Sequence, residues 1–84
     1  FISLDDKIVL LEVEHPDDLI SQRRIRFYQR NGMVLNDQYD YFVPPVRSLK
    51  HRLYFYLMSS SKGLSLDEYH KFYPQILKMV YGIV

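Results

Sequence analysis

The side chains best suited to chemistry gather in the segment Arg23 to Met33, which reads RRIRFYQRNGM. Arg23, Arg26 and Arg30 recur at helical spacing, so they form one cationic stripe along a predicted helix. Guanidinium groups in such a row bind phosphate oxygens, either of a small ligand or of a nucleic-acid backbone. The alternative is a solvated helix face, which is the commoner role of a row of charges.

Other chemistries are excluded by spacing. The histidines, at positions 15, 51 and 70, belong to three different predicted elements and show no H-x-x-x-H or H-E-x-x-H pattern, so we expect no metal site. Ser59 to Gly63 reads SSSKG and lacks the frame of a phosphate-binding loop, so a polar loop is expected there. The sequence contains no cysteine, which excludes a disulfide scaffold and a thiolate-ligated metal.

Length and composition limit the class of protein. The chain has 84 residues, 48% of them hydrophobic, and a net charge of +1. These values predict a single domain over residues 1–84 and argue against disorder. No apolar run approaches the roughly 20 residues of a membrane span, and the weak charge does not by itself indicate nucleic acid. We expect a cytoplasmic protein that binds neither membrane nor nucleic acid.

Hydrophobic patterns divide the chain into five elements. KIVLLEVE and HRLYFYLM carry apolar residues on both alternating faces, which is typical of interior strands. Ser65 and Glu68 form an S-x-x-E capping box that starts a helix. Ile20, Arg24, Phe27 and its neighbour Tyr28 fall on one predicted stripe of the first helix. The expected elements are a strand over 7–14, a helix over 17–31 with Asp17 as its cap, strands over 33–43 and 51–58, and a helix over 65–82.

This order predicts an α+β fold with some α/β character, a three-stranded mixed sheet with two helices. A strand–helix–strand unit implies a right-handed crossover, and the third strand is expected to lie antiparallel between the other two. The strand over 7–14 would then have one unpaired edge, which is a liability for an interior strand. We therefore expect a neighbouring strand from a missing part of the protein, or from a second copy in a homodimer.

The segment Arg23 to Met33, placed directly after LLEVEHP, resembles the C-terminal half of the GNAT acetyltransferase superfamily. In that family a buried strand of LEV type leads to a helix ending in Phe-Tyr, followed by polar residues, Gly and an apolar residue. Here those positions hold Phe27, Tyr28, Gln29-Arg30-Asn31, Gly32 and Met33. The resemblance covers about residues 7–58 and implies a partial GNAT fold.

The resemblance implies an N-acetyltransferase that moves an acetyl group from acetyl-CoA to a primary amine. Tyr28 corresponds to the tyrosine that protonates the departing CoA thiolate as a general acid. The implied cofactor-binding residues are Ser21, Arg24, Phe27 and Tyr28. The implied substrate-binding residues are Glu12, Tyr39 and Tyr41. A carboxylate such as Glu12 or Glu14 helps deprotonate the amine in some members, and a strand-end ion pair is the alternative for both.

The sequence departs from the family in two places. Ser21 stands where the family often has an asparagine that contacts the cofactor. The family's glycine-rich pyrophosphate loop is absent, because Gly32, Gly63 and Gly82 are the only glycines and none fits its pattern. We therefore expect a C-terminal fragment that is inactive alone and whose partners are the N-terminal half of the same protein and an amine acceptor.

Two alternatives belong to other functional classes. A non-catalytic interaction module would use the open sheet edge to accept a partner strand. A small nucleic-acid binder would use the arginine stripe together with tyrosines of the sheet.

Overall fold

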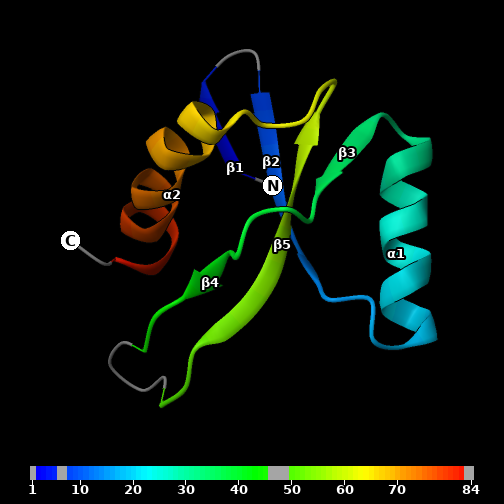
Figure 1. The fold of residues 1–84 in the computed structure, drawn as a ribbon, viewed down its shortest axis with the longest axis horizontal. Helices are drawn as coiled ribbons and strands as arrows, with labels where there is room; N and C mark the ends of the chain where they lie inside the picture. The colour runs from blue at the N-terminus through cyan, green and yellow to red at the C-terminus, as the bar shows by residue number, and fades with distance from the viewer. Residues whose placement is uncertain (1, 6–7, 46–49, 83–84) are drawn as a thin grey trace.

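The computed structural model describes residues 2–5, 8–45 and 50–82 (Figure 1). Within these residues two helices and five strands form an α+β fold, which confirms the fold class. In chain order the elements are β1 (Ile2–Asp5), β2 (Ile8–Glu14), α1 (Leu19–Arg30), β3 (Met33–Asn36), β4 (Phe42–Val43), β5 (Leu53–Ser60) and α2 (Leu66–Tyr81). The sheet has five strands where three were expected. It is also antiparallel throughout instead of mixed, because the strands on either side of α1 are separated by β5 and do not pair with each other.

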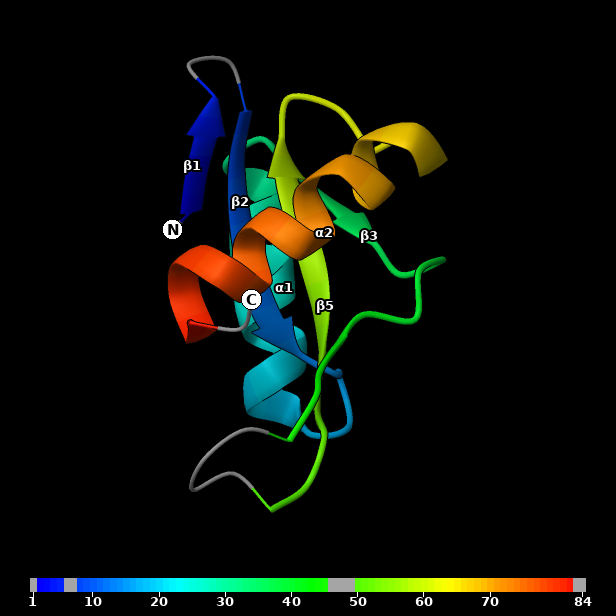
Figure 2. The same ribbon diagram turned by 90° about the vertical axis from the view of Figure 1, so that its left-hand side faces the viewer.

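The strand order of the sheet is β1-β2-β5-β3, and β4 pairs with the far end of β5. Each adjacent pair is antiparallel, so β2 and β3 run in the same direction on either side of β5. The expected position of the third strand between the other two is confirmed. The two helices cover opposite faces, with α2 in front of the sheet in Figure 2 and α1 behind it.

The expected open edge of the first interior strand is wrong for half of its length. β1 folds back on β2 and pairs Ile2 with Leu10 and Ser3 with Val9. Its four residues are too short for a period-two pattern to be visible in the sequence. No strand in the described parts of the chain pairs with the same edge over residues 11–14, so the edge is closed at one end of β2 and open at the other.

Other boundaries shift by small amounts for local reasons. The strand expected over 33–43 is two strands, because a turn at 37–38 and irregular backbone at 39–41 interrupt it. β5 extends to Ser60, beyond the expected end at residue 58, because Ser59 and Ser60 pair with β3. Residue 7 of the first expected strand lies outside the described residues.

Both helices begin at a side-chain cap. The carboxylate of Asp18, not that of Asp17, accepts a hydrogen bond from the backbone nitrogen of Ser21 at 2.7 Å. The N-cap of α1 is therefore one residue later than expected. At α2 the predicted capping box is confirmed, because Ser65 and Glu68 exchange side-chain to backbone hydrogen bonds. The carboxylate of Glu68 also forms an ion pair with Lys62.

The inward face of α1 differs from the predicted stripe. Ser21 and Ile25 are buried against the sheet, whereas Ile20 and Phe27 are 63% and 54% exposed. The helix is thus rotated by about one residue, or roughly 100°. Ser21 is accepted inside because its hydroxyl donates a hydrogen bond to a Glu14 carboxylate oxygen at 3.3 Å.

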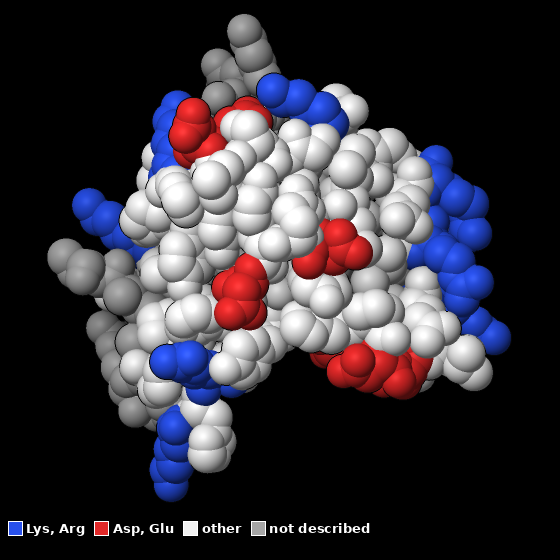
Figure 3. Space-filling model, in the orientation of Figure 1, with Lys and Arg blue, Asp and Glu red and all other residues white. Residues whose placement is uncertain are grey.

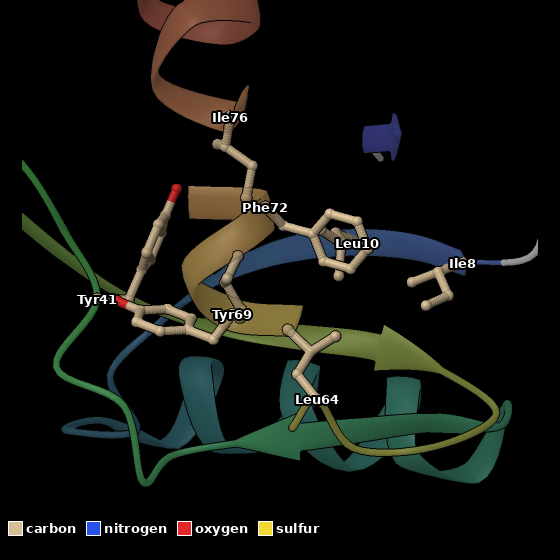
Figure 4. Packing of buried hydrophobic residues seen from close by; sticks show 8 residues of the cluster. Ile8, Leu10, Tyr41, Leu64, Tyr69, Phe72 and Ile76 are labelled. Atoms are coloured by element: carbon tan, nitrogen blue, oxygen red, sulfur yellow. The ribbon is translucent and has the colours of Figure 1, made fainter. Parts of the chain in front are cut away.

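The larger part of the core lies under α2. Figure 4 shows side chains from β2, the loop before β4 and α2 pointing toward one another. Among the described residues this cluster is formed by Ile8, Leu10, Tyr41, Leu57, Leu64, Tyr69, Phe72 and Ile76. The opposite face, under α1, has a smaller buried cluster of Val13, Ile25 and Met58.

Candidate functional site

A cleft of about 310 Å³ opens at the half of β2 that β1 leaves unpaired. All four residues of that half contribute to its wall, together with side chains from α1 and β5. The lining residues are Leu11, Glu12, Val13, Glu14, Arg24, Tyr28 and Phe55. Because the missing neighbour exposes both sides of the strand at this edge, the cleft receives side chains from both faces of the sheet.

Glu12 is fixed in this cleft by two phenol groups. The Tyr81 hydroxyl donates to the carboxylate, lying 2.8 Å from Oε1 and 2.9 Å from Oε2. The Tyr41 hydroxyl donates to Oε2 at 2.5 Å. Burial raises the pKa of both phenols, and the hydrogen bond to the Glu12 carboxylate raises it further. Both tyrosines therefore remain protonated donors at neutral pH.

Tyr28 reaches the same cleft from α1. Its side chain is half-buried and packs against the cluster of Val13, Ile25 and Met58, on the face of the sheet opposite to the Glu12 hydrogen bonds. Its ring lies edge-on to that of Phe27, with centroids 5.4 Å apart. The structure thus brings the predicted catalytic tyrosine and the predicted substrate carboxylate into one cleft.

The remaining cofactor positions are placed differently from one another. Arg24 is exposed and lines the cleft beside Tyr28. Ser21 is 4% exposed on the inner face of α1, and its hydroxyl donates a hydrogen bond to the Glu14 carboxylate. Phe27 faces outward and lines a separate surface hollow of about 520 Å³ with the arginines of α1.

The two loop tyrosines are not brought to the wall of the cleft. Tyr39 donates its hydroxyl to the carbonyl of Leu64 at 2.6 Å and stacks on Tyr69 with centroids 4.3 Å apart. Tyr41 is 1% exposed; its hydroxyl donates to Glu12, and its carbonyl accepts a hydrogen bond at 3.3 Å from the backbone nitrogen of Phe55, which lines the cleft. Tyr41 therefore supports a candidate site residue from behind, within the core.

A further residue of the site, Tyr81, could not be recognised from the sequence. It lies in the last turn of α2, 69 residues after its partner Glu12, and nothing in the local pattern links the two. One indirect signal was available. Glu12 lies two residues after Leu10 and therefore on the same inward face of an interior strand. A carboxylate in that position needs hydrogen-bond donors from elsewhere in the fold.

The arginine stripe forms an outer surface of α1. Arg23, Arg26 and Arg30 are exposed beside Leu19 and Phe27. Figure 3 shows blue side chains along the edge of the molecule where Figure 1 places α1. The stripe lies apart from the cleft, to which α1 contributes Arg24 and Tyr28.

The described residues contain neither a metal-binding cluster nor a helix that could span a membrane. No group of three or more His, Asp or Glu side chains within residues 2–5, 8–45 and 50–82 is placed to hold a metal ion. Neither helix in this part of the chain is long and apolar enough to cross a membrane.

Comparison with known proteins gives one informative result. No family model matches the chain, and no curated protein matches it. A solved structure described as "Putative acetyltransferase from GNAT family from Bacteroides thetaiotaomicron" matches with a TM-score of 0.76 and 32% sequence identity. The match covers 94% of this chain and 44% of the other chain, so these residues span less than half the length of that protein. The resemblance seen in the sequence and the partial fold that it implies are confirmed.

Proposed function

Because this chain fits a fragment of a GNAT-family protein, we propose that the protein containing it transfers an acetyl group from acetyl-CoA to a primary amine. The observation that carries the proposal is the cleft shared by Tyr28 and Glu12. One side chain is suited to protonate a leaving group and the other to meet an amine. The two side chains come from opposite faces of the sheet, and both line the cleft at the open edge of β2.

The reaction assigns a separate task to each group. The amine nitrogen attacks the thioester carbonyl carbon and forms the new C–N bond. The C–S bond then breaks, and the thiolate takes a proton from the Tyr28 hydroxyl. Tyr28 regains a proton from solvent, while the amine nitrogen releases one proton. Glu12 holds the amine at the opposite side of the cleft.

The residues present suit one end of the co-substrate better than the other. Tyr28 and Arg24 line the cleft where the thioester would react. The CoA phosphates need a row of backbone N–H groups, and the three glycines of the sequence do not form such a loop. We assign phosphate binding to the part of the protein outside these 84 residues, and we expect the chain alone to be inactive.

The test compares the full-length protein with its Tyr28→Phe variant on acetyl-CoA and a panel of primary amines, with release of free thiol as the measurement. We expect the variant to lose about 100-fold in kcat because the general acid is gone, with KM values changed by less than about twofold. Tyr54→Phe is the matched control, because Tyr54 is 48% exposed and does not line the cleft.

The outcomes separate the parts of the proposal. An unchanged kcat in Tyr28→Phe would remove Tyr28 from the mechanism. Absence of acetylation by the full-length protein with every amine would refute the proposed function itself. Robust turnover by the 84-residue chain would contradict the expectation that the remaining part of the protein is needed.

A further inference from the structure

Two segments distant in the sequence donate hydrogen bonds to the Glu12 carboxylate. Tyr41 lies 29 residues after Glu12, in the loop before β4, and Tyr81 lies 69 residues after it, at the end of α2. Together the two hydroxyls occupy positions on both carboxylate oxygens. The carboxylate is therefore held in one orientation by donors that belong to the core under α2.

The choice of partners preserves the charge of Glu12. A half-buried carboxylate is ordinarily paired with a cation. In the described parts of the chain no Lys, Arg or His side chain forms an ion pair with Glu12, and its partners are neutral phenols. Hydrogen bonds from neutral donors orient a carboxylate without cancelling a negative charge on it. The charge remains available to a ligand in the cleft.

Of the charged groups that line the cleft, Glu12 is the one suited to bind a cationic ligand. Glu14 lies two residues further along β2 and accepts the hydrogen bond from Ser21. Arg24 and Tyr28 line the wall supplied by α1. The cleft thus has acidic groups on β2 and a cationic group on α1, which suits a ligand with a positive group directed at β2.

We propose that Tyr81, together with Tyr41, positions the Glu12 carboxylate to bind the acceptor as a protonated amine, so that the end of α2 completes the acceptor site. The inference rests on the proposed function, because it assigns the acceptor side of the same cleft. Tyr81 is a positioning residue, since it acts through Glu12. The bound ammonium loses one proton to water before its nitrogen attacks the thioester.

The kinetic test uses the full-length protein and the Tyr81→Phe variant. Loss of one hydrogen bond to a charged group predicts a rise of about tenfold in the KM for the amine, with kcat and the KM for acetyl-CoA within about twofold of wild type. Tyr73→Phe is the matched control on the same helix, because the Tyr73 hydroxyl donates at 2.6 Å to the carbonyl of Phe42 instead. The control is expected to leave the amine KM unchanged.

A double-mutant cycle shows whether Tyr81 acts through Glu12. In a Glu12→Gln background, Tyr81→Phe is expected to change the amine KM by less than about twofold, because the charge that it positions is already absent. An undiminished effect in that background would overturn the positioning role. So would an amine KM that Tyr81→Phe leaves at the wild-type value, even if the variant unfolds at a lower temperature.

An optical titration tests the geometry without activity. Tyrosine ionisation is followed by ultraviolet absorbance in the wild type and in Glu12→Gln. The variant is expected to ionise Tyr81 at lower pH, because burial and the hydrogen bond to the Glu12 carboxylate raise the pKa of this phenol and only burial remains. Tyr41, whose pKa is raised first of all by burial, is expected to stay protonated in both proteins. Identical titrations would refute the contact. A wild type that acetylates no amine would refute the proposed function, whereas a normal amine KM in Tyr81→Phe refutes only the role of Tyr81.

Discussion

The α2 face of the sheet and its α1 face are covered to different depths. Among the described residues the α2 face has a cluster of eight buried side chains, whereas the α1 face has a cluster of three. The helices differ in the same sense, because α1 buries one apolar side chain, Ile25, beside Ser21, whereas α2 buries Tyr69, Phe72 and Ile76. The α2 face anchors the fold, and the α1 face is a thin layer that carries Tyr28 to the cleft.

The cleft lies where the two faces of the sheet are open to each other. Glu12 is held from the α2 face, and Tyr28 packs on the α1 face. A complete sheet would separate the two side chains. Both line one cleft because β1 stops pairing at Leu10, so the edge of β2 beyond that residue is open to both layers. The firmly anchored layer orients the carboxylate, and the thinner layer supplies the tyrosine.

The largest expected effect is at the centre of the α2 face. Ile76→Ala is expected to lower the free energy of unfolding by about 4 kcal/mol, because Ile76 is fully buried and its truncation leaves a cavity. Urea unfolding is the measurement. Met79→Ala is the control on the same helix, since Met79 is 64% exposed, and it is expected to change stability by less than about 0.5 kcal/mol. A loss at Ile76 no larger than at Met79 would contradict the anchoring role.

The same substitution on the α1 face should cost less. Ile25→Ala is expected to lower the free energy of unfolding by about 2 kcal/mol, because fewer buried neighbours surround the side chain and the site collapses more easily. Ile20→Ala is the matched control, with a 63% exposed isoleucine on the same helix. A larger loss at Ile20 than at Ile25 would mean that the face predicted from the sequence points inward after all.

A smaller effect is expected at the start of α2. Ser65→Ala removes the acceptor for the Glu68 backbone N–H and should destabilise the fold by about 1 kcal/mol. Thermal unfolding measures the change. Ser65→Thr keeps a hydroxyl at the cap and should recover most of the loss. Failure of threonine to do so would indicate that the serine matters for packing rather than for capping.

The smallest expected effect is the acid sensitivity of the two helix starts. Hydrogen bonds from Ser21 hold the pKa of Asp18 below 3.8, and one from the Ser65 backbone holds the pKa of Glu68 below 4.5. A lowered folded-state pKa gives stability that is present above the unfolded value and is lost as the pH falls through the folded value. Stability should therefore fall below about pH 4, as the carboxyl groups at both helix starts become protonated.

Urea midpoints measured across this range for Asp18→Asn and Glu68→Gln test the assignment. Each variant should show a weaker fall with acid than the wild type, because the substituted group no longer titrates. An unchanged acid slope in both variants would show that other carboxylates control the acid response.

The sequence by itself determined the local features. Interior strands, the capping box at Ser65, and the Phe-Tyr…Gly motif that resembles GNAT enzymes could all be identified, because each depends on residues within a few positions of one another. The order of the main strands also followed, since a strand–helix–strand unit and an interior third strand leave few topologies. Each of these features is local or follows from general topology.

The tertiary structure alone decided which face of α1 turns inward, how far β1 covers β2, and which donors reach Glu12. The predicted stripe through Ile20 and Arg24 and the observed inward face through Ser21 and Ile25 are offset by one residue along the helix. Only contact with the sheet distinguishes the two faces. The tie between Tyr81 and Glu12 spans 69 residues, a separation over which no periodicity carries information. The physical reason is that packing selects among faces and partners that local patterns leave nearly equal in energy.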